Sequence, residues 1–127
     1  MRAATPFLLA ILGIGLLYAI WPREPIRTEQ APRTAAYADI HGGIKSAIDQ
    51  FEQDNGNYPK SLQDLVQPPA DAKNWHGSYL DSTNLPIDPW GDDYIYEYPG
   101  KHNKNGYDLF SAGPDGKPGT DDDICNW

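Results

Sequence analysis

The fold of this chain is decided by its last third, where residues 107–116 read Tyr-Asp-Leu-Phe-Ser-Ala-Gly-Pro-Asp-Gly and residues 121–127 read Asp-Asp-Asp-Ile-Cys-Asn-Trp. Asp115 lies in a turn bounded by glycine and proline, and carboxylates return seven and eight residues later, at Asp122 and Asp123. Calcium is a hard cation that takes several oxygen ligands at about 2.3–2.6 Å. This stretch therefore predicts a loop organised by a calcium ion.

Two other interpretations of the acidic loop are weaker. In an EF-hand starting at Asp115, the glycine expected at the sixth position would be Thr120, and the bidentate acid expected at the twelfth would be Asn126. A solvated acidic tail would leave neighbouring carboxylates to repel one another without a compensating cation. This acidic run instead precedes Ile124 and Trp127, apolar residues expected to dock on a core. We therefore favour a metal loop.

The strands are expected just before this loop. Residues 94–98 and 107–111 are rich in β-forming residues, and the polar, turn-forming residues 99–106 separate them. Two such segments joined by a short polar turn predict an antiparallel hairpin.

The helices are expected upstream of the hairpin. Thr34 can cap a helix that ends at Asn55-Gly56, and Ser61 with Asp64 resembles a capping box for a second short helix through Val66. Apolar residues recur at steps of three and four and mark a single helical stripe: Tyr37, Ile40, Ile44, Ala47, Ile48 and Phe51. Helices followed by strands predict an α+β fold, with the amphipathic helix packed on a small antiparallel β-sheet.

The N-terminal segment is expected to be a membrane anchor. Residues Ala3 to Trp21 are nearly all apolar and uncharged, and about 19 helical residues cross most of a 30 Å hydrocarbon layer. A cleaved signal peptide and a buried core helix are the alternatives. Prolines punctuate the next segment, which predicts a linker. The expected organisation is therefore an anchor at 1–21, a proline-rich linker at 22–33 and a globular domain at 34–127.

Composition excludes several functions. The net charge of −8 and the pI near 4.6 leave no basic face for nucleic acid. His41, His76 and His102 lie far apart in sequence, which argues against a zinc site, and no nucleophile or phosphate-loop motif is present. The single cysteine, Cys125, permits no intramolecular disulfide and is expected to be a small tucked side chain. We expect neither an enzyme nor a small-molecule substrate.

The order of these motifs resembles a known family. Asp88-Pro89-Trp90-Gly91, the stretch 107–116 and the ending 122–127 are similar, over about residues 35–127, to the protein G family, the major pseudopilins of type II secretion systems. A Gly-x-Tyr-Pro turn at 56–59 supports the resemblance. It implies a pseudopilin or type IV pilin-like fold.

The resemblance also implies a calcium site and its ligands. Side chains of Asp115, Asp122 and Asp123 and main-chain carbonyls of Ala112 and Thr120 would hold the ion, while Asp121 would point outward. The ion would pin the strand-like C-terminal tail to the hairpin.

Location is likewise implied by the resemblance. Arginines on both sides of the apolar segment mildly favour a cytoplasmic domain by the positive-inside rule. A calcium loop of extracellular affinity favours the opposite side. We therefore expect a single-pass protein of the bacterial inner membrane, with its C-terminal domain in the periplasm.

The sequence is compatible with two functions. The first is a structural pseudopilin-like subunit that joins a secretion filament with protein partners of the apparatus or with its own copies. The second is a membrane-tethered, calcium-binding adaptor that does not polymerise. Family members carry a glycine, an aromatic residue and a glutamate at the start of the apolar helix, whereas Ala3 to Trp21 contains no acid. On that pattern, the mature protein is expected to begin at or near Met1 and to form no filament unaided.

Overall fold

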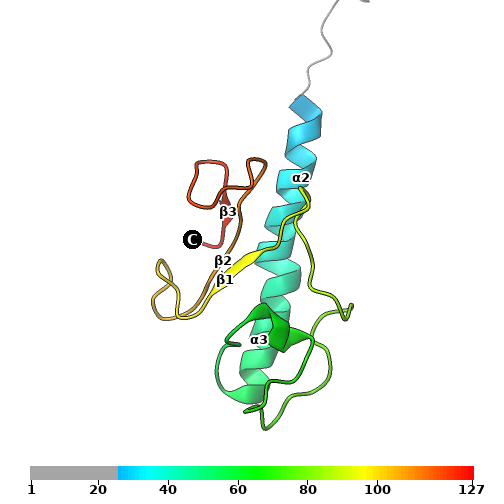
Figure 1. Cartoon of the computed structure of the whole chain (residues 1–127), viewed down its shortest axis with the longest axis vertical. Coiled ribbons are helices and arrows are strands. Elements are labelled where there is room, and N and C mark those ends of the chain that lie inside the picture. The colour runs from blue at the N-terminus through cyan, green and yellow to red at the C-terminus, as the bar shows by residue number, and fades with distance from the viewer. Residues whose placement is uncertain (1–25) are drawn as a thin grey trace, which may run out of the picture.

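The computed structural model describes the backbone of residues 26–127 and the side chains of residues 30–127. The expected membrane anchor at 1–21 and the first part of the expected linker, residues 22–25, lie outside the described residues. Figure 1 shows one long helix with a small sheet beside it and loops around its lower end. Within residues 26–127, no helix has the length and apolar character needed to cross a bilayer.

The long helix consists of three consecutive segments. They are α2 (Ile26–Ala38), a π-helical turn η1 (Asp39–Gly43) and α3 (Ile44–Asn55). The helix ends where the sequence predicts, because Gly56 adopts a left-handed φ of 81° and its N–H donates to the Glu52 carbonyl at 2.8 Å. Glycine has no Cβ to oppose this conformation.

The expected linker at 22–33 and the helix start at Thr34 are corrected by the structure. Residues 26–33 already belong to α2, and Pro32 lies inside it. Thr34 does not cap the helix, because its hydroxyl donates to the Gln30 carbonyl one turn earlier, at 2.9 Å. Proline fixes φ near the helical value and removes one helical hydrogen bond. Packing of the following turns can outweigh the loss of one hydrogen bond, so Pro32 does not mark the start of the helix.

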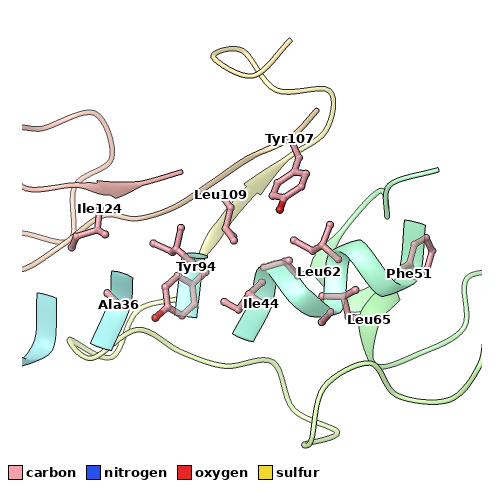
Figure 2. Close-up of a cluster of buried hydrophobic side chains, with 12 residues drawn as sticks. Ala36, Ile44, Phe51, Leu62, Leu65, Tyr94, Tyr107, Leu109 and Ile124 are labelled. Atoms are coloured by element: carbon pink, nitrogen blue, oxygen red, sulfur yellow. The ribbon is translucent and has the colours of Figure 1, made fainter. Parts of the chain in front are cut away.

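The apolar stripe of the helix forms the core, with one exception. Tyr37 is 57% exposed, and Ala36 is buried in its place. The π turn changes the spacing, so buried residues recur every four positions from Ala36 through Ile40 to Ile44. Figure 2 shows the cluster that these residues form with side chains from the loops and strands. Its members are Ala36, Ile40, Ile44, Ala47, Ile48, Phe51, Leu62, Leu65, Tyr94, Tyr107, Leu109 and Ile124.

The sheet covers this stripe and confirms the predicted hairpin. Strand β1 (Ile95–Glu97) pairs antiparallel with β2 (Asp108–Ser111), which pairs antiparallel with β3 (Ile124–Cys125). Tyr96 lies opposite Leu109, and Ser111 lies opposite Ile124. A helix packed on a small antiparallel sheet is the α+β fold that the sequence predicts.

The second helix is shorter and tighter than expected. It is a 3₁₀ turn, η2 (Leu62–Leu65), rather than a helix through Val66. The predicted capping box is present: the Asp64 carboxylate accepts the N–H groups of Lys60 at 3.0 Å and Ser61 at 3.3 Å. The hydroxyl of Tyr96 donates to the Pro59 carbonyl at 2.6 Å and thereby ties this region to β1.

Candidate metal centre

The loop between β2 and β3, residues 112–123, is called the acidic loop, and a buried carboxylate from a distant turn fixes its start. Asp88 is 3% exposed and accepts the N–H groups of Trp90 at 3.1 Å and Asp92 at 2.8 Å. Its other oxygen accepts the Ser111 hydroxyl at 2.6 Å, and the Ser111 oxygen accepts the Gly113 N–H at 3.1 Å. The Asp-Pro-Trp-Gly turn thus determines where the chain leaves β2.

Gly113 lets the two ends of the loop meet. Its φ is +70°, a left-handed conformation that side chains rarely adopt. A Cβ at this position would lie 2.4 Å from the Asp122 carbonyl oxygen. Glycine is therefore required here both by conformation and by space, because the backbones of residues 113 and 122 approach each other directly.

Three carboxylates gather inside the closed loop. Asp115, Asp122 and Asp123 each offer one oxygen, and these oxygens lie within 4.8 Å of one another. Asp115 is exposed, whereas Asp122 and Asp123 are partly buried. Oxygen atoms at such separations can share a single cation of the size of calcium. Asp121 is exposed and does not belong to this group.

Each carboxylate has one oxygen fixed by a backbone N–H group. Oδ1 of Asp115 accepts the Lys117 N–H at 2.8 Å, and Oδ2 of Asp122 accepts the Asp115 N–H at 3.0 Å. Oδ2 of Asp123 accepts the Gly119 N–H at 2.7 Å. The second oxygen of each carboxylate points to a common centre, where it contacts the Thr120 hydroxyl. The backbone of the loop therefore orients the three carboxylates without a bound ion.

The Thr120 hydroxyl cannot satisfy the three oxygens around it. Its Oγ1 lies 2.8 Å from Oδ2 of Asp115, 2.5 Å from Oδ1 of Asp122 and 3.3 Å from Oδ1 of Asp123. A hydroxyl has one hydrogen to donate, so most of this negative charge is left uncompensated. The hydrogen bond from Thr120, together with the Asp115 N–H, lowers the pKa of Asp122 and keeps it ionised despite partial desolvation. A donor set of charged oxygens with too few protons fits a divalent cation.

The two residues whose main-chain carbonyls are predicted ligands, Ala112 and Thr120, lie toward opposite ends of the loop. Ala112 is buried directly after β2, at the entry to the loop. The Thr120 carbonyl accepts the Asp123 N–H at 3.3 Å. Their role as calcium ligands stays a prediction. Sequence reasoning did not identify the Thr120 hydroxyl as a member of the site, nor Asp88 as the residue that fixes the start of the loop. An aspartate that opens a Pro-Trp-Gly turn is a signal that could have identified Asp88.

Comparison with known proteins places the chain in a family. The family model described as type II secretion system (T2SS), protein G, matches residues 26–127. The type II secretion system core protein G of Escherichia coli K12 is 39% identical, over 94% of this chain and 85% of that protein. The core protein G of Pseudomonas aeruginosa is 42% identical, over 92% of this chain and 85% of its own length.

A solved structure agrees with the sequence comparisons. The crystal structure of the major pseudopilin from the type 2 secretion system of enterohaemorrhagic E. coli matches with a TM-score of 0.70 and 35% identity. The match covers 85% of this chain and 92% of that one. With the predicted fold present and the family model spanning every described residue, the chain belongs to the protein G family of type II secretion systems.

Proposed function

We propose that this chain is a structural, non-catalytic, pseudopilin-like component of a type II secretion system. In this proposal its globular domain lies in the periplasm on an inner-membrane anchor, and a calcium ion stabilises it. Family membership supports the role in secretion. The calcium part rests on one observation: one carboxylate oxygen each of Asp115, Asp122 and Asp123 converges on a common centre, while the other oxygen of each is held by a backbone N–H group.

The residues present fit a calcium ion. Carboxylates of Asp115, Asp122 and Asp123 would bind it, and carbonyls of Ala112 and Thr120 would complete its ligands. Bound calcium would supply the positive charge that the cluster lacks. The protein's own contribution is to close the loop by way of Gly113, so that residues on both sides of the turn reach one ion.

The test is thermal unfolding of residues 26–127 in millimolar calcium and in chelator. A ligand that binds only the folded state stabilises it by RT ln(1 + [L]/Kd), which is about 2.7 kcal/mol at a calcium concentration of about 100 times Kd. We expect a melting temperature higher in calcium by several degrees. The Asp123→Ala variant should lose this response, because it lacks one of the converging oxygens.

Asp121→Ala is the matched control. It removes the same charge from the same acidic run but leaves the converging set intact, so its response to calcium should equal that of the wild type. Coincident melting curves for the wild type with and without calcium would refute the calcium proposal. Equal losses of the calcium response in Asp123→Ala and Asp121→Ala would show that the aspartates assigned as ligands are the wrong ones.

A second candidate function is a membrane-tethered adaptor that binds calcium without polymerising. The absence of an acidic residue between Ala3 and Trp21 favours it, because the acid that would pair with a neighbouring subunit is missing from that segment. The same globular domain serves either function. The two candidates therefore differ in assembly and agree on the metal centre.

A further inference from the structure

Two side chains of the long helix contact main-chain carbonyls at the end of the acidic loop and in β3. Nη1 of Arg33 donates to the Asp122 carbonyl at 3.4 Å in a partly buried contact. Nε2 of His41 lies 3.2 Å from the Cys125 carbonyl. Because a carbonyl can only accept, this histidine nitrogen must carry the hydrogen. The Tyr37 ring packs against His41, with ring centroids 4.0 Å apart.

The two donors and the two carbonyls are separated by comparable lengths of chain. Arg33 and His41 are eight residues apart, which is about 12 Å along a helix. Asp122 and Cys125 are three residues apart, which spans at most about 10 Å. Between these contacts, the buried Ile124 packs in the same cluster as Ala36, as Figure 2 shows.

The π turn helps to align the two donors. In a regular α-helix, a residue eight positions onward is rotated by two turns and about 80°. The wider turn of η1, which includes His41, advances each residue by a smaller angle. His41 is thereby brought back toward the face that carries Arg33.

We propose that Arg33 is a positioning residue for the metal centre, with His41 as its second point of attachment. This inference rests on the proposed function, since it concerns the same site. The Asp122 carbonyl is held between Gly113 and Arg33, while the carboxylates of Asp122 and Asp123 point into the loop. Fixing the main chain at residue 122 therefore orients two of the three predicted side-chain ligands.

If Arg33 acted only through its charge, its removal would change calcium affinity in the direction opposite to that expected for a positioning residue. A positive charge next to a cation site repels the cation, so its removal should tighten calcium binding. If Arg33 instead positions the loop, its removal should weaken binding despite the relieved repulsion. The sign of the change in affinity therefore separates the two explanations.

The experiment titrates calcium into the full chain in detergent and measures its affinity by calorimetry. We expect Arg33→Met, which keeps an apolar stem and loses the donors, to bind about three- to tenfold more weakly, as for loss of one hydrogen bond. Arg33→Lys retains a charged donor and should recover part of this loss. An affinity of Arg33→Met equal to or tighter than the wild type would overturn the proposal.

Lys45→Met is the matched control. Lys45 also lies on the long helix and carries the same charge, but it pairs with Asp49 one turn onward. Its replacement should leave calcium affinity unchanged. A loss equal to that of Arg33→Met would show that the weakening does not depend on the contact with Asp122, and would contradict the positioning role.

Hydrogen exchange in chelator tests the same idea without metal. The Gly119 amide is bonded to Asp123, so it should exchange about three- to tenfold faster in Arg33→Met. The Leu109 amide, which donates to the side chain of Asn126, should keep its rate. Unchanged exchange at Gly119 would overturn the inference. A wild type that binds no calcium would refute only the calcium part of the proposed function, because this arm contains no metal.

Discussion

Asp108 shows how one residue can organise a loop without any ligand. Asp108 is 1% exposed, and its carboxylate accepts three backbone N–H groups, from Lys101 at 2.7 Å and from His102 and Asn103 at 2.9 Å. Burial raises the pKa of Asp108, but these hydrogen bonds and the His102 ring outweigh burial, and the net pKa is lowered. The hairpin turn therefore depends on an ionised buried aspartate.

Replacing Asp108 with asparagine should destabilise the domain near neutral pH. The amide offers one acceptor oxygen and places an N–H₂ group against backbone donors, which costs about 1–3 kcal/mol for an unsatisfied buried group. The measurement is urea unfolding of residues 26–127 at pH 7, with Asp81→Asn, an exposed aspartate, as the control. The control should unfold like the wild type.

The same pair of variants gives a pH test. Because the folded-state pKa of Asp108 is lowered, its stabilising contribution is fully present above the unfolded pKa of about 3.9 and is lost as pH falls through the folded value. The stability difference between the wild type and Asp108→Asn should therefore shrink below about pH 4. A difference that stays constant down to pH 3 would argue against an ionised Asp108.

At the scale of single residues, the sequence identified the carboxylates of the predicted site more easily than the groups that contact them. Asp115, Asp122 and Asp123 could be selected because residue type and spacing within one loop limit what they can reach. Arg33 could not, because it meets Asp122 across 89 residues and bonds to a carbonyl, a group that every residue carries. The Thr120 hydroxyl was missed for a related reason, since its role depends on the direction in which the loop turns.

At the scale of elements, the π turn η1 contains two glycines that its geometry does not require. Gly43 has helical angles, φ −58° and ψ −55°, and nothing lies within 4 Å of a Cβ built on it. Glycine in a helix is less favourable than alanine by about 1 kcal/mol. We therefore expect Gly43→Ala to raise the free energy of unfolding by up to about 1 kcal/mol, measured by urea denaturation.

Gly113→Ala provides the contrast for this prediction. Its φ is positive and its Cβ would clash with the Asp122 carbonyl, so the same substitution should destabilise the domain and weaken any response to calcium. A destabilised Gly43→Ala would instead show that the π turn itself needs glycine. The comparison tests whether a glycine is retained for conformation or is simply tolerated.

Elements were predictable where local pattern and packing agreed. The helix end at Gly56 and the hairpin follow from turn residues and from alternation, and tertiary structure leaves both unchanged. The helix start was wrong because proline was given more weight than the packing of the turns after it. Tyr37 was misassigned to the core because a constant step of 3.6 residues cannot describe a helix that contains a π turn.

For the molecule as a whole, the proposed role makes a prediction about secretion. Deleting the gene in its own bacterium should abolish export by the type II system, and the full chain should restore it. Residues 26–127 alone should not, because the apolar segment at Ala3 to Trp21 would hold a structural subunit in the membrane. The measurement is the amount of exported protein in the culture medium.

Two results of this assay, and one from a separate sedimentation experiment, would discriminate between the proposals. Rescue by residues 26–127 would contradict the membrane-anchor proposal, and normal export in the deletion strain would contradict a structural role. Fibres that sediment from cells expressing the full chain alone would favour the polymerising subunit over the tethered adaptor.

The contact between Arg33 and Asp122 also has a consequence for the order in which the domain folds. It joins positions 89 residues apart, and β3 and the end of the acidic loop are synthesised after the long helix. Contacts of high sequence separation carry a large loop-closure entropy and form late. The long helix can therefore form early, but Ile124 reaches the core only after synthesis has passed it. An ion bound by Asp122 and Asp123 would then stabilise this late contact and reduce the time that the apolar stripe of the helix is exposed to other chains.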